Sequence, residues 1–196
     1  MKQLSALLLF FILHASFATA QARLKEYIVQ MPDSVLPLLT NVNRADCIDF
    51  REAGMEAKVT NRLGGTTELS ALTDDYALWQ YTISSQVEMK LLPMNDSTNI
   101  ICVVHTAQVP EPDSHIAFYD DHWQPLPTTS CWPSLLDTRN QSSSLSTLHL
   151  TLSPEVSSMK AEFRKETYEM KDENAVMTPT TETYWYDWKE GTFTLR

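Results

Sequence analysis

Residues 86–106 constrain the fold of this chain more than any other stretch. In residues 87–92 apolar and polar side chains alternate until the last position, which predicts a strand with one apolar face and one solvated face. Residues 93–97 combine Pro, Asn, Asp and Ser, which favour turns for separate backbone reasons. Residues 100–104 are apolar on both faces and mostly β-branched, which predicts a strand covered on both sides; a buried helix is the alternative, but the run is short for one. We therefore expect a hairpin from which further strands pair outward.

The N-terminus has the pattern of a secretory signal peptide. Lys2 supplies a positive start, residues 4–17 are almost entirely apolar, and Ala18-Thr19-Ala20 offers small residues before a cleavage point at Gln21. A membrane anchor is the alternative, but a bilayer span needs about 20 apolar residues. No cysteine follows the small residues, and no later stretch is long and apolar enough to span a membrane. The sequence thus predicts a signal peptide over residues 1–20 and an exported protein, periplasmic or secreted and not lipid-anchored.

Residues 21–196 are long enough for a single globular domain with a sizeable core. Acidic residues outnumber basic ones, 25 to 15, and they are dispersed along the chain. A net charge of −10 repels nucleic acid and anionic lipid rather than binding them. We therefore expect no nucleic-acid partner.

Three cysteines, Cys47, Cys102 and Cys131, leave at least one thiol unpaired even in an oxidising compartment. Any two of the three could pair, and the sequence leaves these alternatives open. Cys102 lies in the most apolar run of the chain, which favours a buried thiol.

Two short helices are expected near the start of the domain. Met31-Pro32-Asp33-Ser34 has the residues of a helix N-terminus, and the apolar residues up to position 39 supply a buried face that Pro37 shortens. A clearer helix follows, with Asn43 as a candidate cap and Gly54 as a candidate terminator.

From residue 57 onward the period of the apolar residues is two, and turn formers separate the runs. The fold class that this predicts is α+β, mainly β: two short N-terminal helices followed by a long antiparallel meander of about ten strands. The meander would form a sheet with helices on one face, or two packed sheets. Residues 171–179 are interpreted as a polar link, and residues 140–146 as a Ser-rich loop. The expected strands are residues 57–62, 67–72, 76–82, 87–92, 100–104, 114–119, 148–152, 159–168, 181–186 and 191–195.

Several segments together are similar to one family: residues 31–39, 48–55, 61–65 with 72–75, 89–93 with 101–106, and 186–193. On these residues the chain resembles an exported bacterial family known only as domain of unknown function 3256, typical of Bacteroidales. The resemblance covers most of the domain. It implies a Gram-negative source, a periplasmic or secreted location and no assigned activity, and it supplies no catalytic residues.

Bacteria of this kind attach O-glycans at Asp-Ser or Asp-Thr followed by an apolar residue or Thr. The resemblance therefore makes Ser34, in Asp33-Ser34-Val35, and Ser97, in Asp96-Ser97-Thr98, candidate O-glycosylation sites. The alternative is that Ser34 caps a helix and Ser97 serves a turn.

Motifs for catalysis and cofactor binding are missing from the sequence. There is no G-x-S-x-G, H-E-x-x-H, P-loop or G-x-G-x-x-G. Gly64-Gly65-Thr66-Thr67 lacks the Lys of a phosphate loop and is interpreted as a hairpin turn. We expect no cofactor.

The best metal candidates are His115, Asp120, Asp121 and His122, since imidazole and carboxylate ligands suit zinc or manganese. The two histidines lie at opposite ends of one short strand and turn, so we interpret the group as solvated turn residues and expect no metal. Paired acids such as Asp120 and Asp121 would serve a glycosidase only across a cleft.

Cys102 or Cys131 with His105 or His149 is a formal nucleophile and base. Cys102 and His105 are disfavoured because an offset of three places them on opposite faces of a strand. The sequence therefore predicts that the protein is not an enzyme.

Aromatic residues gather in the later part of the chain. Tyr184, Tyr186 and Trp188 would share one strand face, and Trp123 lies in an earlier turn. An exposed row of this kind stacks on sugar rings or contacts a partner. The alternative is that these residues pack in the core.

These observations favour a non-catalytic, exported interaction or structural domain of the bacterial envelope. Its partner would be an unknown envelope protein or a glycan. The first alternative is a glycan-binding module that uses the C-terminal aromatics, and the second is a hydrolase with acidic residues around Asp120.

Overall fold

The computed structural model describes residues 23–95, 98–133, 146–171 and 174–196. Two antiparallel sheets carry the fold, and within each sheet every strand pairs with the next one in sequence. The predicted fold class is confirmed, with two N-terminal helices and an antiparallel meander that is divided between a seven-stranded and a four-stranded sheet. No helix in the described ranges is long and apolar enough to cross a membrane.

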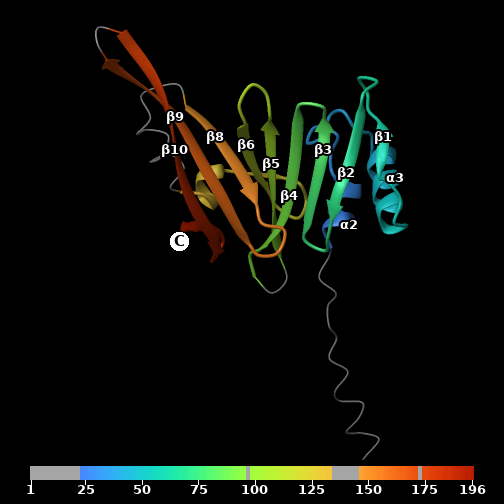
Figure 1. The fold of residues 1–196 in the computed structure, drawn as a ribbon. Coiled ribbons are helices and arrows are strands. Elements are labelled where there is room, and N and C mark those ends of the chain that lie inside the picture. Colours follow the sequence, from blue (N-terminus) through green and yellow to red (C-terminus); the bar gives the residue numbers. More distant parts are fainter. Residues whose placement is uncertain (1–22, 96–97, 134–145, 172–173) are drawn as a thin grey trace, which may run out of the picture.

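The seven-stranded sheet has the order β1-β2-β3-β4-β5-β6-β7. Figure 1 shows these strands side by side from β1 at one edge to β6 near the small sheet. Their bounds are β1 Lys58–Thr60, β2 Thr66–Leu72, β3 Tyr76–Thr82, β4 Ser85–Pro93, β5 Asn99–Ala107, β6 Asp113–Tyr119 and β7 Pro125–Leu126.

The four-stranded sheet has the order β11-β10-β9-β8, and a one-turn helix, α4 (Thr128–Cys131), precedes it. Strands β9 and β10 pair over residues 158–171 and 174–187, so the polar link expected at 171–179 is wrong: most of it belongs to β10. The Ser-rich loop expected at 140–146 lies almost wholly outside the described residues. The bounds are β8 Ser146–Leu152, β9 Ser158–Lys171, β10 Asn174–Lys189 and β11 Thr192–Leu195.

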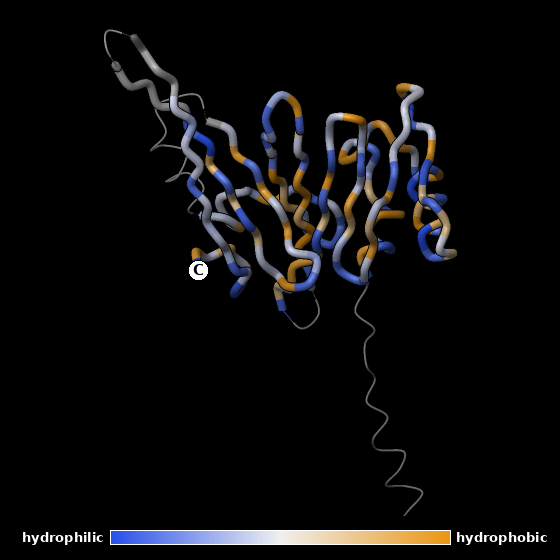
Figure 2. The backbone as a smooth tube through the Cα atoms, in the orientation of Figure 1, coloured by the Kyte–Doolittle hydropathy of each residue, from blue (hydrophilic) through white to orange (hydrophobic). Residues whose placement is uncertain are grey.

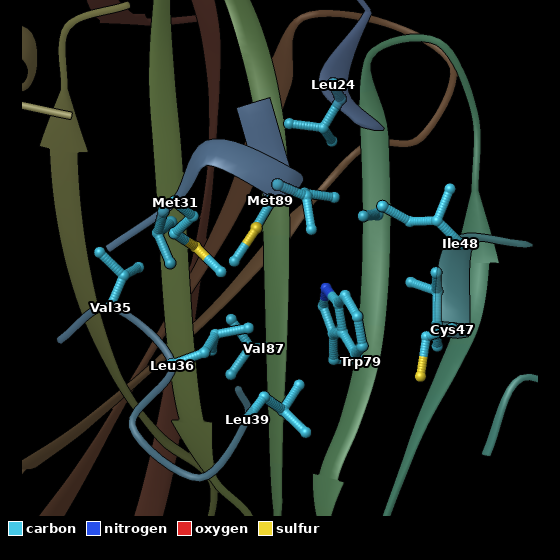
Figure 3. Packing of buried hydrophobic residues seen from close by; sticks show 14 of the residues in the cluster. Leu24, Met31, Val35, Leu36, Leu39, Cys47, Ile48, Trp79, Val87 and Met89 are labelled. Atoms are coloured by element: carbon cyan, nitrogen blue, oxygen red, sulfur yellow. The ribbon is translucent and has the colours of Figure 1, made fainter. Parts of the chain in front are cut away.

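Helices α2 (Leu24–Gln30) and α3 (Asn41–Glu52) cover one face of the seven-stranded sheet together with the turns between them. The Trp79 side chain of β3 lies at the centre of this first core, fully buried. Figure 3 shows it between Cys47 and Ile48 of α3 on one side and Val87 and Met89 of β4 on the other. Helix α3 begins with a capping box in which Thr40 and Asn43 bond each other's backbone N–H, and Gly54 beyond its end has a positive φ of 70°.

The helix expected at residues 31–39 does not form, and the segment is a series of turns. Most of its apolar residues are nevertheless buried, and the Arg44 side chain hydrogen-bonds two carbonyl oxygens of the segment and one of α2. The Arg44 guanidinium, 1% exposed, donates to the carbonyl oxygens of Ile28 (3.2 Å), Met31 (2.5 Å) and Leu39 (3.1 Å). The first helix is instead α2, in the stretch expected to be a lead-in.

The second core lies between the two sheets. Figure 2 shows hydrophobic residues alternating with hydrophilic ones along the strands, which gives each sheet an apolar face to bury. Leu148, Leu150 and Leu152 of β8 contribute to this core, as do Cys102 and Val104 of β5. Strand β5 is therefore covered on both sides, as its sequence predicts.

The prediction that the polar face of β4 is solvated is wrong. Glu88 is 3% exposed and Lys90 is fully buried, because the small sheet covers them. The Lys90 ammonium lies 2.8 Å from the Asp75 carboxylate and donates to the carbonyl oxygen of Pro154 at 3.1 Å. The buried charge is thus paired and hydrogen-bonded, which is the condition for its burial.

Candidate binding face

Three of the four aromatic residues proposed for binding lie in the protein interior. Tyr186 is 2% exposed, Trp188 is 8% exposed and Trp123 is 6% exposed, while Tyr184 is half-buried. Tyr184, Tyr186 and Trp188 do share one strand face, as expected, but that face turns toward the seven-stranded sheet. The exposed aromatic row is therefore not formed.

Trp188 fastens the small sheet to the large one. Its indole Nε1–H donates to the carbonyl oxygen of Pro93 at 2.8 Å, and its ring centroid lies 5.0 Å from that of Phe193 and 6.4 Å from that of Phe118. These contacts are those of a core residue.

The outer face of β10 carries a tryptophan that the sequence reasoning passed over. All five tryptophans lie in the described ranges; four are buried and Trp185 is 45% exposed. The alternation of side chains along a strand could have indicated this residue: if Tyr184 and Tyr186 face the core, Trp185 faces away from it. We call the outer surface of β8–β11 around this residue the Trp185 face.

Charged side chains flank Trp185 on both sides. Lys160 of β9 is its cross-strand partner, and directly opposite residues share a sheet face. On the other side the backbone N–H of Arg196 donates to the Trp185 carbonyl oxygen at 2.8 Å, and the Arg196 guanidinium lies 5.9 Å from the indole centroid. The indole therefore has a cation on each side.

Each of these cations is paired with a carboxylate. Arg196 donates to Asp187 from Nε at 3.1 Å and from Nη2 at 2.5 Å, and this contact lowers the pKa of Asp187. Lys160 Nζ lies 2.8 Å from Glu162 Oε1, and Glu162 Oε2 lies 3.3 Å from His149 Nδ1. The ion pairs balance the charges of the polar groups beside the ring.

A hollow of about 160 Å³ lies on the same sheet face. Its lining includes Thr181, two positions from Thr183 and four from Trp185, so it lies in line with the indole along β10. An ion pair at its rim joins Arg164 Nη1 to Glu111 Oε2 at 2.5 Å. The other lining residues are Pro112, Thr147, His149 and Glu162.

A larger hollow, about 580 Å³, lies between the β1–β2 and β3–β4 loops. Leu63 and Ile83 at its rim are 78% and 99% exposed, and Glu68 is the one charged residue in its lining. Glu68 is paired with Lys58 at 3.6 Å, and the other lining residues of this hollow are uncharged.

The acidic turn after β6 brings three of the four metal candidates together. The ligand atoms of Asp120, Asp121 and His122 lie within 4.8 Å of one another. Asp120 Oδ1 accepts the backbone N–H groups of His122 (2.9 Å) and Gln124 (2.8 Å), and His122 Nδ1 is 2.5 Å from Asp121 Oδ1. His115 lies outside the group, on β6 opposite His105 of β5. The carboxylates share one turn, so they do not face each other across a cleft.

The cysteine–histidine combinations are separated by the sheets. All three cysteines are free and buried. Cys102 lies in the second core, whereas the His105 ring contacts Tyr81 of the first core, so the two are on opposite faces as expected. Burial raises the pKa of the Cys102 and Cys131 thiols. A thiol in this environment is a poor nucleophile.

Comparison with known proteins gives the family directly. The family described as protein of unknown function DUF3256 matches residues 16–193. The chain belongs to the DUF3256 family. No curated protein matches the sequence. Among solved structures, a domain of an uncharacterized protein from Porphyromonas gingivalis W83 is similar, with a TM-score of 0.66 and 25% sequence identity; the match covers 90% of this chain and 99% of that one.

DUF3256 membership confirms the resemblance drawn from the sequence, including its Bacteroidales character. For the two candidate O-glycosylation sites, Ser34 is exposed in a turn, while Ser97 lies outside the described residues. The neighbouring Asp33 is bound by Arg44 at 2.9 Å and by Arg62 at 2.5 Å, and both hydrogen bonds lower its pKa. Ser34 does not cap a helix, so that alternative role is wrong.

Proposed function

We propose that this DUF3256 protein is a non-catalytic interaction domain that acts outside the cytoplasm and binds its ligand with the Trp185 face. The observation that carries the proposal is the exposure of Trp185. A tryptophan is a large apolar surface that normally contributes to a core, and the other four in this chain do so. One left exposed among ion-paired polar groups has the composition of a binding hot spot.

The position of Trp185 adds support. At Trp185 the backbone of β10 pairs with β9 on one side and accepts the Arg196 backbone N–H on the other, so the indole is attached to a hydrogen-bonded part of the sheet. A binding residue on a strand is held more firmly than one on a loop, and less conformational entropy is lost when the ligand arrives.

A non-catalytic role agrees with the state of the reactive groups in the described residues. The thiols are buried, and the Asp120 carboxylate is occupied by two backbone N–H groups of its own turn. On the Trp185 face each carboxylate is bonded to a cation beside it. The export of the protein is proposed from the signal-peptide pattern of residues 1–20.

Affinity capture tests the proposal. Residues 21–196 would be used as bait in a crosslinked Bacteroidales envelope extract, in parallel with Trp185→Ala and with Ile83→Ala. Ile83, 99% exposed against 45% for Trp185, is an apolar control on another face. We expect wild type and Ile83→Ala to retain the same material and Trp185→Ala to lose it. Equal capture by all three proteins would refute the Trp185 face, and turnover of an envelope substrate would refute the non-catalytic role.

A further inference from the structure

The Trp185 face also indicates what kind of ligand it binds. We infer that the ligand is an uncharged oligosaccharide, with one sugar ring stacked on the Trp185 indole and another sugar of the same chain in the hollow beside Arg164. This inference rests on the proposed function, because it names the ligand class of the same face.

The indole supplies the stacking surface. The C–H face of a pyranose is apolar, while its hydroxyl groups point outward from the rim of the ring. A partner therefore needs one flat apolar surface surrounded by hydrogen-bonding groups. Trp185 provides that surface, and Lys160 and Arg196 lie on either side of it.

The paired charges select against a charged ligand. Lys160 is neutralised by Glu162, Arg196 by Asp187 and Arg164 by Glu111, all within 2.8 Å. An anionic ligand would have to displace a carboxylate from its cation, and a cationic ligand would have to do the reverse. A hydroxyl group both donates and accepts, so it can add to an existing ion pair without breaking it.

Two other ligand classes that stack on tryptophan are disfavoured by charge and shape. Single-stranded nucleic acid binds through stacking together with unpaired cations that follow its backbone. Here the cations around the ring are paired, and the chain carries a net charge of −10. The core of a protein–protein interface is depleted of Lys, Asp and Glu, whereas Lys160 and Asp187 lie close to Trp185 on this face.

The spacing of the two features predicts a ligand longer than one sugar. Thr181 in the hollow and Trp185 are four residues apart on one strand, which corresponds to about 13 Å. A chain that touches both must run along β10. Affinity should therefore rise from monosaccharide to short oligosaccharide and then level off.

The test measures binding of defined sugars to residues 21–196 by calorimetry and by tryptophan emission. The probes are neutral β-1,4-linked and α-1,4-linked glucan, mannan and xylan oligomers, their monosaccharides, and an anionic oligogalacturonate. Because the other four tryptophans are buried, a change in emission on binding reports Trp185. We expect at least one neutral oligomer to bind, to bind more tightly than its monosaccharide, and to bind more tightly than the anionic oligomer.

Variants assign the binding to the face. Trp185→Ala is expected to weaken binding about tenfold or more, Trp185→Phe less, and Ile83→Ala not at all. Since Trp185 is exposed, all three variants should keep the wild-type unfolding midpoint. If no neutral oligomer binds while capture from envelope extract still depends on Trp185, the carbohydrate inference is wrong and the proposed function stands. If capture is also indifferent to Trp185, both are wrong.

Discussion

The Glu88 carboxylate of β4 accepts a hydrogen bond from the backbone N–H of Leu152 of β8, with 3.1 Å between Oε2 and the amide nitrogen. Two further amides along the same edge are bonded in the same way, Leu150 N–H by Ser114 Oγ at 3.0 Å and Leu148 N–H by Asp113 Oδ1 at 3.1 Å. Side chains of the large sheet therefore occupy alternate donors on the free edge of the small one. An edge strand treated in this way offers fewer groups to a foreign strand.

The buried Glu88 carboxyl predicts an unusual pH dependence of stability. Burial raises its pKa, against the opposing effect of hydrogen bonds from Tyr76 and Leu152. A carboxyl group whose pKa is higher in the folded state stabilises the fold fully below its unfolded pKa, and this contribution is lost as the pH rises through the folded value. Urea unfolding of wild type and Glu88→Gln should show the advantage of wild type greatest near about pH 4 and shrinking toward neutrality.

Two parallel stability curves would contradict this account of Glu88. Glu88→Ala provides the structural control, since it leaves the Leu152 N–H and the Tyr76 hydroxyl without their acceptor. It should cost about 3 kcal/mol of unfolding free energy.

Arg44 is predicted to be essential for the N-terminal segment. Arg44→Ala removes three bonds to carbonyl oxygens and one to Asp33, and it takes the Arg44 donor away from the carbonyl oxygens of Met31 and Leu39. We expect a loss of about 3 kcal/mol or more in the free energy of unfolding by urea. Arg51→Ala, at an exposed position of the same helix, should change it by less than about 0.5 kcal/mol. Similar losses in the two variants would show that the contacts of Arg44 contribute little.

The β10–β11 turn can be improved. Glu190 and Gly191 connect the paired residues Lys189 and Thr192 with φ values of 50° and 82°, the pattern of a type I′ turn. Glu is poorly suited to positive φ, whereas Asn-Gly is the preferred sequence for such a turn. Glu190→Asn should raise the unfolding free energy by about 0.5–1 kcal/mol in thermal or urea unfolding. The same change at Glu155 serves as the control, and a destabilised Glu190→Asn would exclude the proposed turn strain.

The three thiols should be unreactive in the native protein. Burial raises the pKa of Cys47 to about 11, and it raises the pKa of Cys102 well above its ordinary value. At pH 8 a disulfide reagent such as Ellman's should therefore react with none of the three until the protein unfolds, and then with all three. Fast reaction of one native thiol, or fewer than three thiols after unfolding, would contradict the free and buried state of these residues.

Much of the fold could be predicted because period-two patterns survive wherever one face of a strand is buried. The strand expected at residues 76–82 coincides with β3, and the doubly apolar run at 100–104 lies within β5. The helix expected at 31–39 does not form, although most of its apolar residues are buried. Arg44 donates to the carbonyl oxygens of Met31 and Leu39 at the two ends of the segment, and the apolar pattern of the segment does not indicate these contacts.

The candidate site could be predicted only in part. The sequence places Tyr184, Tyr186 and Trp188 on one face of a strand and Trp185 on the other, but it does not say which face meets the second sheet. That choice depends on the packing of β8–β11 against β4–β6. The prediction for Glu88 was wrong for the same reason. A charged residue in an alternating strand indicates a solvated face, unless the residues that cover it from elsewhere in the chain are known.

Because within each sheet every strand pairs with its immediate predecessor, the order of assembly can follow the order in which the chain is delivered. The first core and the strand pairings of the seven-stranded sheet involve no residue beyond 126, and local pairings of this kind form early. The apolar face that includes Cys102 and Val104 then stays uncovered until the last third of the chain packs on it. A product truncated before β8 would carry a finished first core and an uncovered second one, so premature termination should yield an aggregating fragment rather than a smaller stable protein.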